Sequence, residues 1–434
     1  MKLTAFQSDK GDCLFLESAD RKNRMLVDGG IERAYTQHVA PALATLRKQK
    51  KSVDIVYISH IDEDHIAGIL QLLDDEAAWR VHEHQVNNGN PTHPRPEVDR
   101  PAAVKRIFHN AFSDLVGDES ERIEDMLAAT ATILSGAENP IFRRIAQERR
   151  DLANSIPQAL KVSKRVAKNQ LNIPLNPDFS GKLMLVRDNI PSIPLGSITL
   201  RVLGPFPEDL KKLRGEWRKW LEDHEEQVQK IRTNAQKDAA DIGSSVGSFI
   251  GPMLQEAEQL GAAELALAKE LGNRKKVTTP NLASLMFLAE EQGQKILLTG
   301  DGHWEDIIKG LEHHQAFDGT NKLHVDVLKV QHHGSEHNIA KGFCERVTAD
   351  RYVFCGNGEH ENPDLDVLDL IFNHRMNNDQ KPFTFLFNSS STQSVNADGA
   401  AHMQEVEKLV AKMKTKSQQR LKTKFITGSK LSVI

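Results

Sequence analysis

Residues 57–68 read YISHIDEDHIAG, and this stretch decides the fold. Before His60 comes Val53 to Ile58, a β-branched run with few charges, which is typical of a buried strand. After His65 comes the apolar helix start Ile66 to Leu70. The polar residues in between are therefore predicted to lie at the carboxyl end of a strand, where sites collect in layered α/β folds.

These polar residues include four potential metal ligands, namely His60, Asp62, Asp64 and His65. A strand-to-helix turn can direct His60 and Asp62 at one ion. It can direct Asp64 and His65 at a second ion. Imidazoles together with carboxylates suit Zn²⁺ or Mn²⁺. A solvated polar loop is the alternative interpretation, but such a loop rarely concentrates ligand-type residues in this way.

Two later strands end in residues of the same kind. The apolar run Leu297-Leu298-Thr299 leads through Gly300 to Asp301, a carboxylate placed to bridge two metal ions. By itself this pattern also fits an ordinary turn aspartate. The strand predicted over Val325 to Val330 delivers His332 and His333 into a Gly-Ser turn, and one of this pair is expected to be a ligand. The prediction is that three strand ends, far apart in sequence, meet around a pair of cations.

The rest of the chain places these motifs in an α/β pattern. Strands are predicted over 13–17, 24–27, 53–58, 197–203, 285–288, 295–299, 325–330, 351–355 and 383–387, and a helix over 39–49. Helical patterns cover about 99–168, 207–238 and 253–271. We therefore predict one α/β domain over 1–95 and 275–400, a mainly helical insertion over 96–274 whose strand near 197–203 belongs to the core, and a basic C-terminal tail over 401–434.

Composition narrows the class of protein. The net charge of −4 gives no global attraction to nucleic acid or anionic membranes. No run approaches the roughly 20 apolar residues of a membrane helix, and the first residues lack the apolar core of a secretory signal. Cys13, Cys344 and Cys355 form no CxxC pair, so we expect reduced thiols. These features predict a cytoplasmic protein that does not bind membranes.

Taken together, the motifs resemble the metallo-β-lactamase superfamily, and most closely the hydrolase domain of bacterial competence (DNA-uptake) channel proteins and its stand-alone relatives. The resemblance covers about 1–95 and 275–390. The matching segments are Asp28-Gly29-Gly30, His60 to Gly68, Asn281 to Ser284, Leu298 to Asp301, His332 to Ser335, and Gly356 to His360 with Pro363. It implies an αβ/βα sandwich, here with a large helical insertion.

The resemblance also implies roles for single residues. The implied metal ligands are His60, Asp62, Asp64, His65, Asp301 and one or both of His332 and His333, which would hold two divalent ions, Zn or Mn. Asp301 would bridge, Asp64 would also accept the proton of the water, and His360 would serve the leaving group. Asp28 and Asn281 would support the ligands by hydrogen bonding. Ser335 is expected to form the turn rather than act as a nucleophile.

The chain departs from the family pattern at two points. Asp62 stands where many members have a second histidine, which makes the site harder and more anionic. Members of the wider superfamily also supply a further histidine after the motif. The candidates here are His82, His84 and Asn88, and none matches securely, so one metal position would lack a protein ligand.

The expected function is metal-dependent hydrolysis of phosphodiesters by a nuclease or phosphodiesterase, with DNA or RNA as the partner. The tail supports this through its basic residues, namely Lys408, Lys412, Lys414, Lys416, Arg420, Lys422, Lys424 and Lys430. A solvated helix face explains them equally well. Two alternatives stay open: hydrolysis of a small ester, amide or lactam, and a scaffold with a decayed site whose insertion binds a protein partner. The sequence does not indicate an oligomeric state.

Overall fold

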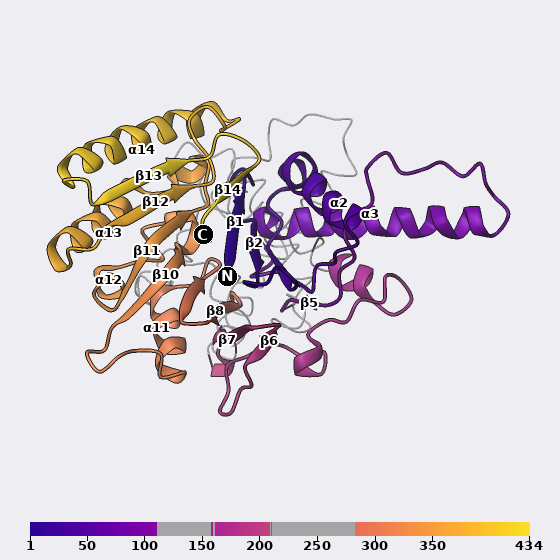
Figure 1. Ribbon diagram of the computed structural model, residues 1–434, viewed down its shortest axis with the longest axis horizontal. Helices are drawn as coiled ribbons and strands as arrows, with labels where there is room; N and C mark the ends of the chain where they lie inside the picture. The colour runs from indigo at the N-terminus through magenta and orange to yellow at the C-terminus, as the bar shows by residue number, and fades with distance from the viewer. Residues whose placement is uncertain (111–157, 159–160, 209, 211–282) are drawn as a thin grey trace, which may run out of the picture.

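The computed structural model describes residues 1–110, 158, 161–208, 210 and 283–434. Two mixed β-sheets pack face to face, and helices cover their outer faces (Figure 1). This is the predicted α/β sandwich. No helix within the described ranges is both long enough and apolar enough to cross a membrane.

The first sheet has the strand order β14-β1-β2-β3-β4-β5. Its strands are β1 (Lys2–Phe6), β2 (Leu14–Glu17), β3 (Arg24–Val27), β4 (Ile55–Tyr57), β5 (Ile107–Phe108) and β14 (Lys430–Ser432). Its helices are α1 (Glu32–Ala34), the π-helix η1 (Tyr35–Val39), α2 (Ala40–Lys48) and α3 (Glu63–Asn87). β3, β4 and β5 run parallel, so their carboxyl ends share one edge.

The second sheet has the strand order β13-β12-β11-β10-β9-β8-β7-β6. Its strands are β6 (Ile193–Leu195), β7 (Ile198–Gly204), β8 (Met286–Glu291), β9 (Gln294–Leu298), β10 (Leu323–Lys329), β11 (Val347–Phe354), β12 (Phe383–Phe387) and β13 (Leu421–Phe425). The helices are α11 (Trp304–His313), α12 (Lys341–Arg346), α13 (Leu365–Asn378) and α14 (Ala397–Lys416). Short 3-10 turns are η3 (Pro177–Phe179), η5 (Gln331–Gly334) and η6 (Glu359–Glu361). β9 to β13 are parallel.

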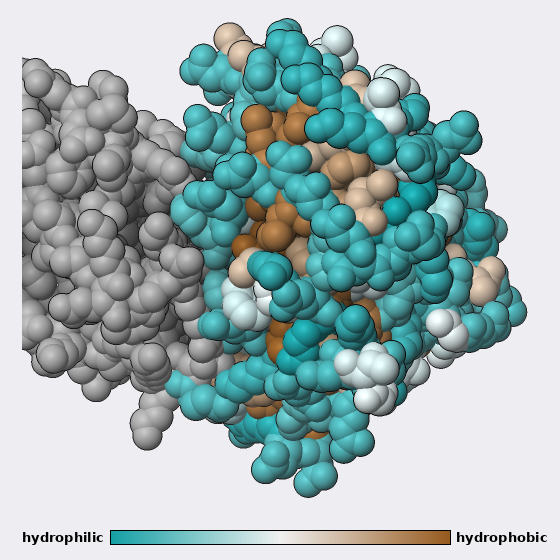
Figure 2. Space-filling model, turned by 90° about the vertical axis from the view of Figure 1, so that its left-hand side faces the viewer, coloured by the Kyte–Doolittle hydropathy of each residue, from teal (hydrophilic) through white to brown (hydrophobic). Residues whose placement is uncertain are grey.

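Strand alternation explains why the sheets form this sandwich. In β4, Ile55 and Tyr57 face the core between the sheets, whereas Val56 faces the helices. Because successive strand residues point to opposite faces, an apolar run buried on both faces must be covered on both sides. α11 to α14 cover the second sheet in the same way. Figure 2 shows this helical layer from outside, where hydrophilic side chains predominate and apolar ones show between them.

The structure corrects the predicted role of 401–434. This segment is not a tail, because α14 packs on the second sheet, β13 pairs with β12, and β14 pairs with β1. Of the last two strands, β13 therefore belongs to the second sheet and β14 to the first. Basic composition misled the prediction, since the exposed lysines of α14 alternate with the buried Met403, Val406 and Val410.

The predicted insertion is only partly described. Within 96–274, β5 joins the first sheet, and β6 and β7 join the second, so these parts belong to the core. The chain after residue 99, which was predicted to be helical, first runs extended into β5. Most of the helical segments predicted over 99–168, 207–238 and 253–271 lie outside the described residues, and the insertion stays a prediction.

Candidate metal centre

The motif residues lie between the end of β4 and the first turn of α3. Asp62 precedes the helix, and Asp64 and His65 lie in its first turn. The positive end of the helix dipole favours carboxylates at this place. Two glycines let the helix approach the turn after β3: Gly29 N–H donates to the carbonyl of His65 (2.8 Å), and Gly68 N–H donates to that of Gly30 (2.9 Å). A Cβ atom on Gly68 would lie 2.1 Å from the Gly29 carbonyl oxygen.

Asp301 lies at the centre of the cluster of predicted ligands. It follows β9, is 2% exposed, and directs its Oδ2 atom at four imidazole rings. The Nε2 atoms around Oδ2 are those of His333 (3.3 Å), His65 (3.4 Å), His60 (3.6 Å) and His332 (3.7 Å). The strand ends of β4, β9 and β10 thus meet, as predicted.

The two other motif carboxylates, Asp62 and Asp64, lie on different sides of Asp301. Asp62 Oδ2 is 3.5 Å from Nε2 of His60. Asp64 Oδ2 is 3.1 Å from Nε2 of His333 and 3.9 Å from that of His65. The structure therefore brings all seven predicted ligands into one cluster. Apart from His332, it also divides them into a His60–Asp62 side and an Asp64–His65–His333 side, with Asp301 between.

Two of the rings, those of His60 and His65, are held by contacts at their Nδ1 atoms, on the side away from Asp301. Nδ1 of His65 lies 3.0 Å from Oδ2 of Asp28, which is fully buried. Asp28 also accepts hydrogen bonds from the backbone N–H (2.7 Å) and hydroxyl (2.8 Å) of Ser59. The same hydroxyl is 3.0 Å from Nδ1 of His60. Asp28 thus lies where the sequence prediction put it, behind the ligands.

The other two rings have partners that the sequence did not indicate. Nδ1 of His332 is 2.7 Å from Oδ1 of Asn338, and Nδ1 of His333 is 3.2 Å from Oδ1 of Asp12. Every ring of the cluster therefore presents Nδ1 to an outer oxygen and Nε2 to the centre. A proton on Nδ1 leaves the Nε2 lone pair free for a metal, which is the usual arrangement of histidine ligands.

Lys329 is a buried cation beneath the cluster. It is the last residue of β10 and is 1% exposed. Its ammonium pairs with Oδ2 of Asp12, donates to the carbonyl of Gly300 (2.9 Å), and lies 3.4 Å from Oδ1 of Asp301. Burial alone would lower the pKa of Lys329, but the carboxylates of Asp12 and Asp301 raise it above its usual value. The lysine therefore stays charged.

The pKa shifts in the cluster follow from burial and opposite charges. Burial acts to lower the pKa of His65, but the carboxylates around it, Asp301 first, raise it well above its usual value. The pKa of His333 is raised for the same reason. Burial acts to raise the pKa of Asp301, but His333 and His65 hold it well below its usual value. In the metal-free protein the carboxylates therefore favour positive charge on the rings of His65 and His333. A bound metal ion would supply that positive charge in place of the ring protons.

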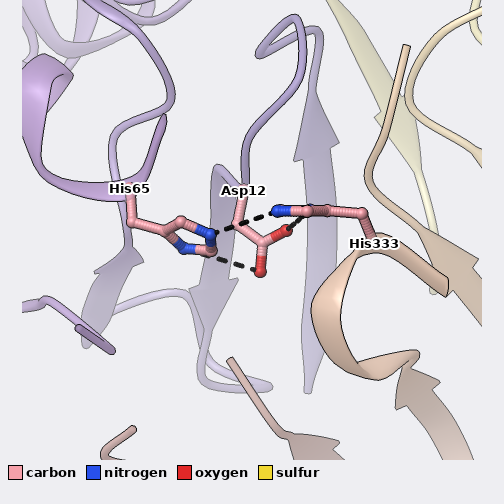
Figure 3. A group of neighbouring side chains, drawn as sticks. All are labelled: Asp12, His65 and His333. Atoms are coloured by element: carbon pink, nitrogen blue, oxygen red, sulfur yellow. Dashed lines mark hydrogen bonds and ion pairs between the residues drawn. The ribbon is translucent and has the colours of Figure 1, made fainter. Parts of the chain in front are cut away.

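The donor set fits divalent metal ions. Ligand atoms of His60, His65 and Asp301 lie within 4.8 Å of one another, and the same holds for Asp12, His65 and His333 (Figure 3). In the second group Asp12 faces Lys329, so we interpret it as a support for His333 rather than a ligand. Among the described residues, Nε2 of His60 and Oδ1 of Asp62 are buried without a hydrogen-bond partner. A bound cation would satisfy both atoms.

Other predicted residues lie elsewhere. His84 and Asn88 are exposed on the distal half of α3, which projects from the body in Figure 1, and bond to each other. His82, half-buried on the same half, faces the Trp79 ring. These three candidates are therefore wrong as ligands of this cluster, because a long helix carries its later turns away from its first.

Three further predictions concern the loops. His360 is exposed in η6, within the loop whose Pro363 packs against Gly334, and its role stays a prediction. Asn281 lies outside the described residues. Ser335 donates its backbone N–H to the carbonyl of His332 (2.8 Å), as a residue that forms the turn would do.

Sequence reasoning missed Asp12, Lys329, Asn338 and the buried His109 that follows β5. One signal was available: Lys329 interrupts the apolar run before His332, and a charge in a buried strand requires a partner. Nothing in the local sequence distinguished Asp12, since its nearest partners, Lys329 and His333, come from the other sheet.

Comparison with known proteins agrees with the predicted family. The model of the Metallo-beta-lactamase superfamily matches residues 9–134, a range that contains Asp28 and the His60 to His65 motif. The resemblance to this superfamily is confirmed over that range, and the two-sheet fold is consistent with it. The match does not single out the competence-protein hydrolases. No curated protein matches the chain.

Proposed function

We infer that this chain, whose residues 9–134 match the Metallo-beta-lactamase superfamily, is a metal-dependent hydrolase that cleaves phosphodiesters. One observation carries the inference: four imidazole Nε2 atoms converge on one buried carboxylate oxygen of Asp301, at 3.3 to 3.7 Å. Each ring is oriented by an oxygen at its Nδ1 atom. A carboxylate at the centre of such a cluster is placed to bridge two cations.

The formal charge of the site supports two ions. The buried or half-buried carboxylates around the cluster are Asp12, Asp28, Asp62, Asp64 and Asp301, and Lys329 is the cation among them. With neutral histidines, five carboxylates and one ammonium leave four negative charges, which two divalent cations would neutralise. We propose Zn²⁺ or Mn²⁺, because imidazole and carboxylate donors are mixed.

When bound, such ions supply a hydroxide at neutral pH and stabilise negative charge on the substrate. The residues of the chain then have distinct tasks. Asp301 would help to hold both ions, and Asp64, which lies beside His333, would take the proton of the attacking water. Asp28 keeps His65 oriented. His360, exposed in the neighbouring loop, is the proposed proton donor to the leaving group.

The hard, carboxylate-rich donor set supports a phosphodiester as substrate, since it suits ions that prefer phosphoryl oxygens. The basic segment adds little support. Lys414 and Lys416 lie at the end of α14 that precedes β13, whereas the first turn of α14 adjoins the loop beside Gly334 and Pro363. Helix direction therefore places these lysines at the sheet edge opposite the cluster, and a nucleic acid bound in the site need not touch them.

The test is metal content together with turnover of bis(p-nitrophenyl) phosphate. We expect about two equivalents of retained metal in the wild type, and a loss of turnover by about a hundredfold or more in Asp64→Ala. The matched control is Asp350→Ala, because Asp350 is an exposed aspartate that pairs with His324. Equal turnover by the wild type and Asp64→Ala contradicts the hydrolase proposal.

A competition experiment separates the substrate classes. If the natural substrate is a nucleic acid, short DNA or RNA oligonucleotides should inhibit cleavage of the small phosphodiester and be cut themselves. Turnover of the small diester that oligonucleotides leave unchanged would favour a small-molecule phosphodiesterase. Hydrolysis of a carboxylic ester or lactam with no turnover of any phosphodiester would contradict the proposed substrate class.

A further inference from the structure

Lys10 is a cation beside the cluster of predicted ligands. It lies in the turn between β1 and β2, at the sheet edge where β3 and β4 also end, because β1 and β3 both run antiparallel to β2 and β4 runs parallel to β3. Asp12, two residues further along, lies between the rings of His65 and His333 (Figure 3). The turn that carries Lys10 is therefore part of the wall of the site.

Packing fixes this turn against the first turn of α3. A Cβ atom on Gly11 would lie 1.7 Å from the carbonyl oxygen of Asp64, so a glycine is required for the two backbones to approach this closely. The hydroxyl of Ser8 donates to the carbonyl of Gly11 (2.6 Å) and accepts from the side-chain amide of Asn388, which follows β12 (2.7 Å). Lys10 therefore has a defined place next to the motif.

The exposed side chains of the cluster show where a substrate can approach. The side chains of Asp62, Asp64 and His332 are 25%, 16% and 28% exposed. The other predicted ligands are buried. A substrate therefore reaches the centre over these three side chains, which we call the mouth of the site.

The ammonium of Lys10 lies on the Asp64 side of this mouth. The Lys10 side chain is 18% exposed, and its Nζ atom is 3.8 Å from Oε2 of Glu63, the residue before Asp64. Burial acts to raise the pKa of Asp64, but the neighbouring histidines, and then the charge of Lys10, hold it below its usual value. Both observations place the ammonium close to a group bound at the mouth.

A cation at the mouth suits an anionic substrate. Two divalent ions would neutralise the carboxylates of the cluster, so the centre as a whole would exert little net attraction on a phosphodiester anion. A lysine ammonium has three N–H donors and forms strong, charge-assisted hydrogen bonds to phosphoryl oxygens. The separation of Lys10 from Glu63 is longer than a hydrogen bond, and the flexible lysine side chain can turn from this carboxylate to a substrate.

We propose that Lys10 binds a non-bridging oxygen of the scissile phosphodiester and thereby selects anionic over neutral substrates. The inference rests on the proposed function and names a residue that determines the specificity of that site. Glu63 holds the ammonium near the mouth when no substrate is bound and competes with the substrate for it. Negative charge on the phosphoryl oxygens grows as the water attacks, so the contact strengthens in the transition state.

The first test is the steady-state kinetics of the metal-loaded full chain, with the metal content of each variant measured in parallel. We expect Lys10→Met to lower kcat/KM for bis(p-nitrophenyl) phosphate by about 10- to 100-fold, because a hydrogen bond between charged groups is lost. Lys10→Arg keeps the charge and should recover part of this loss. The matched control is Lys2→Met, since Lys2 also lies 3.8 Å from a glutamate, Glu17, but at the opposite end of β1.

The second test measures binding of inorganic phosphate to the zinc-loaded protein by isothermal titration calorimetry, which does not depend on turnover. Lys10→Met should weaken this binding by about tenfold or more. Glu63→Gln should strengthen it, because a competing carboxylate is removed. A lysine that only fixed the turn would instead lower stability in urea and leave the affinity for phosphate unchanged.

The outcomes separate this inference from the proposed function. If the wild type cleaves the diester, and Lys10→Met binds phosphate and cleaves the diester equally well, the inference is wrong and the proposed function stands. An equal loss of kcat/KM with the neutral ester p-nitrophenyl acetate would contradict the selection of anions. If the wild type cleaves no phosphodiester, the proposed function is wrong, and the role of Lys10 in its reaction is wrong with it.

Discussion

The ammonium of Lys329 and the carboxylate of Asp12 form an ion pair that is almost wholly buried and joins the two sheets beneath the histidine and carboxylate cluster. Lys329 ends β10 of the second sheet, and Asp12 lies in the turn between β1 and β2 of the first. Through this pair the lysine holds Asp301 on one side, and Asp12 faces His333 on the other. The positions of Asp301 and His333 thus depend on a buried charge pair that links the two sheets.

Removing this charge should destabilise the protein strongly. Lys329→Met leaves the buried carboxylate of Asp12 without its ammonium partner, and we expect a loss of about 3–5 kcal/mol in the free energy of unfolding of the metal-free protein. The double variant with Asp12→Asn should lose less than the sum of the single changes. Urea unfolding measures both. Lys105→Met is the control, since Lys105 is 60% exposed and its pair with Asp54 should contribute about 0–1 kcal/mol.

His333 should matter more for metal binding than His332. His333 lies within 3.3 Å of Asp12, Asp64 and Asp301, whereas the side chain of His332 is 28% exposed and lies 3.7 Å from Asp301. We expect His333→Ala to lose a tightly held ion and His332→Ala to keep it with about tenfold weaker affinity. Metal analysis after dialysis measures this. Equal retention by the two variants would show that the pair shares the role.

Gly68 should not tolerate a methyl group. Alanine normally stabilises a helix relative to glycine by about 1 kcal/mol. Here its Cβ would lie 2.1 Å from the carbonyl oxygen of Gly29, so Gly68→Ala should instead destabilise by about 2–3 kcal/mol and displace the first turn of α3. The midpoint temperature of thermal unfolding and the affinity for metal should both fall. Gly319→Ala, which meets nothing within 4 Å, should change stability by less than about 0.5 kcal/mol.

The raised pKa of Asp75 on α3 predicts that the stability of the protein depends on pH. Burial first, and then the charges of Asp74 and Glu32, raises its pKa to about 6, against the restraint of a hydrogen bond from Gln71. The folded state therefore binds the proton more tightly than the unfolded state, and stability falls as the pH rises from about 4 through 6.

Asp75→Asn removes this loss. We expect the variant to be more stable than the wild type by about 1–2 kcal/mol at pH 7–8, after allowance for screening, with no advantage below about pH 4. Urea unfolding at a series of pH values measures the difference. A difference that does not change with pH would mean that Asp75 does not titrate in this range.

The sequence by itself determined the local structures of this protein. Short apolar runs such as Arg24–Val27 and Phe383–Phe387 are strands over the predicted residues, because burial on both faces leaves few polar positions. The ligand-type residues were visible for a related reason: carboxylates and histidines crowded at strand ends have little structural use there. The spacing within 60–65 also fixed their place in the turn before a helix.

Only the tertiary structure decided which distant residues complete the site. Asp12 pairs with Lys329, Asn338 donates to the carbonyl of Asp301, and His109 comes beside β4 only when the two sheets pack and neighbouring strands align. None of these contacts is between residues close in sequence. The same packing turned the predicted basic tail into β13 and β14, one in each sheet. Local periodicity reports which face of a segment is buried, but it contains no information about which other segment covers that face.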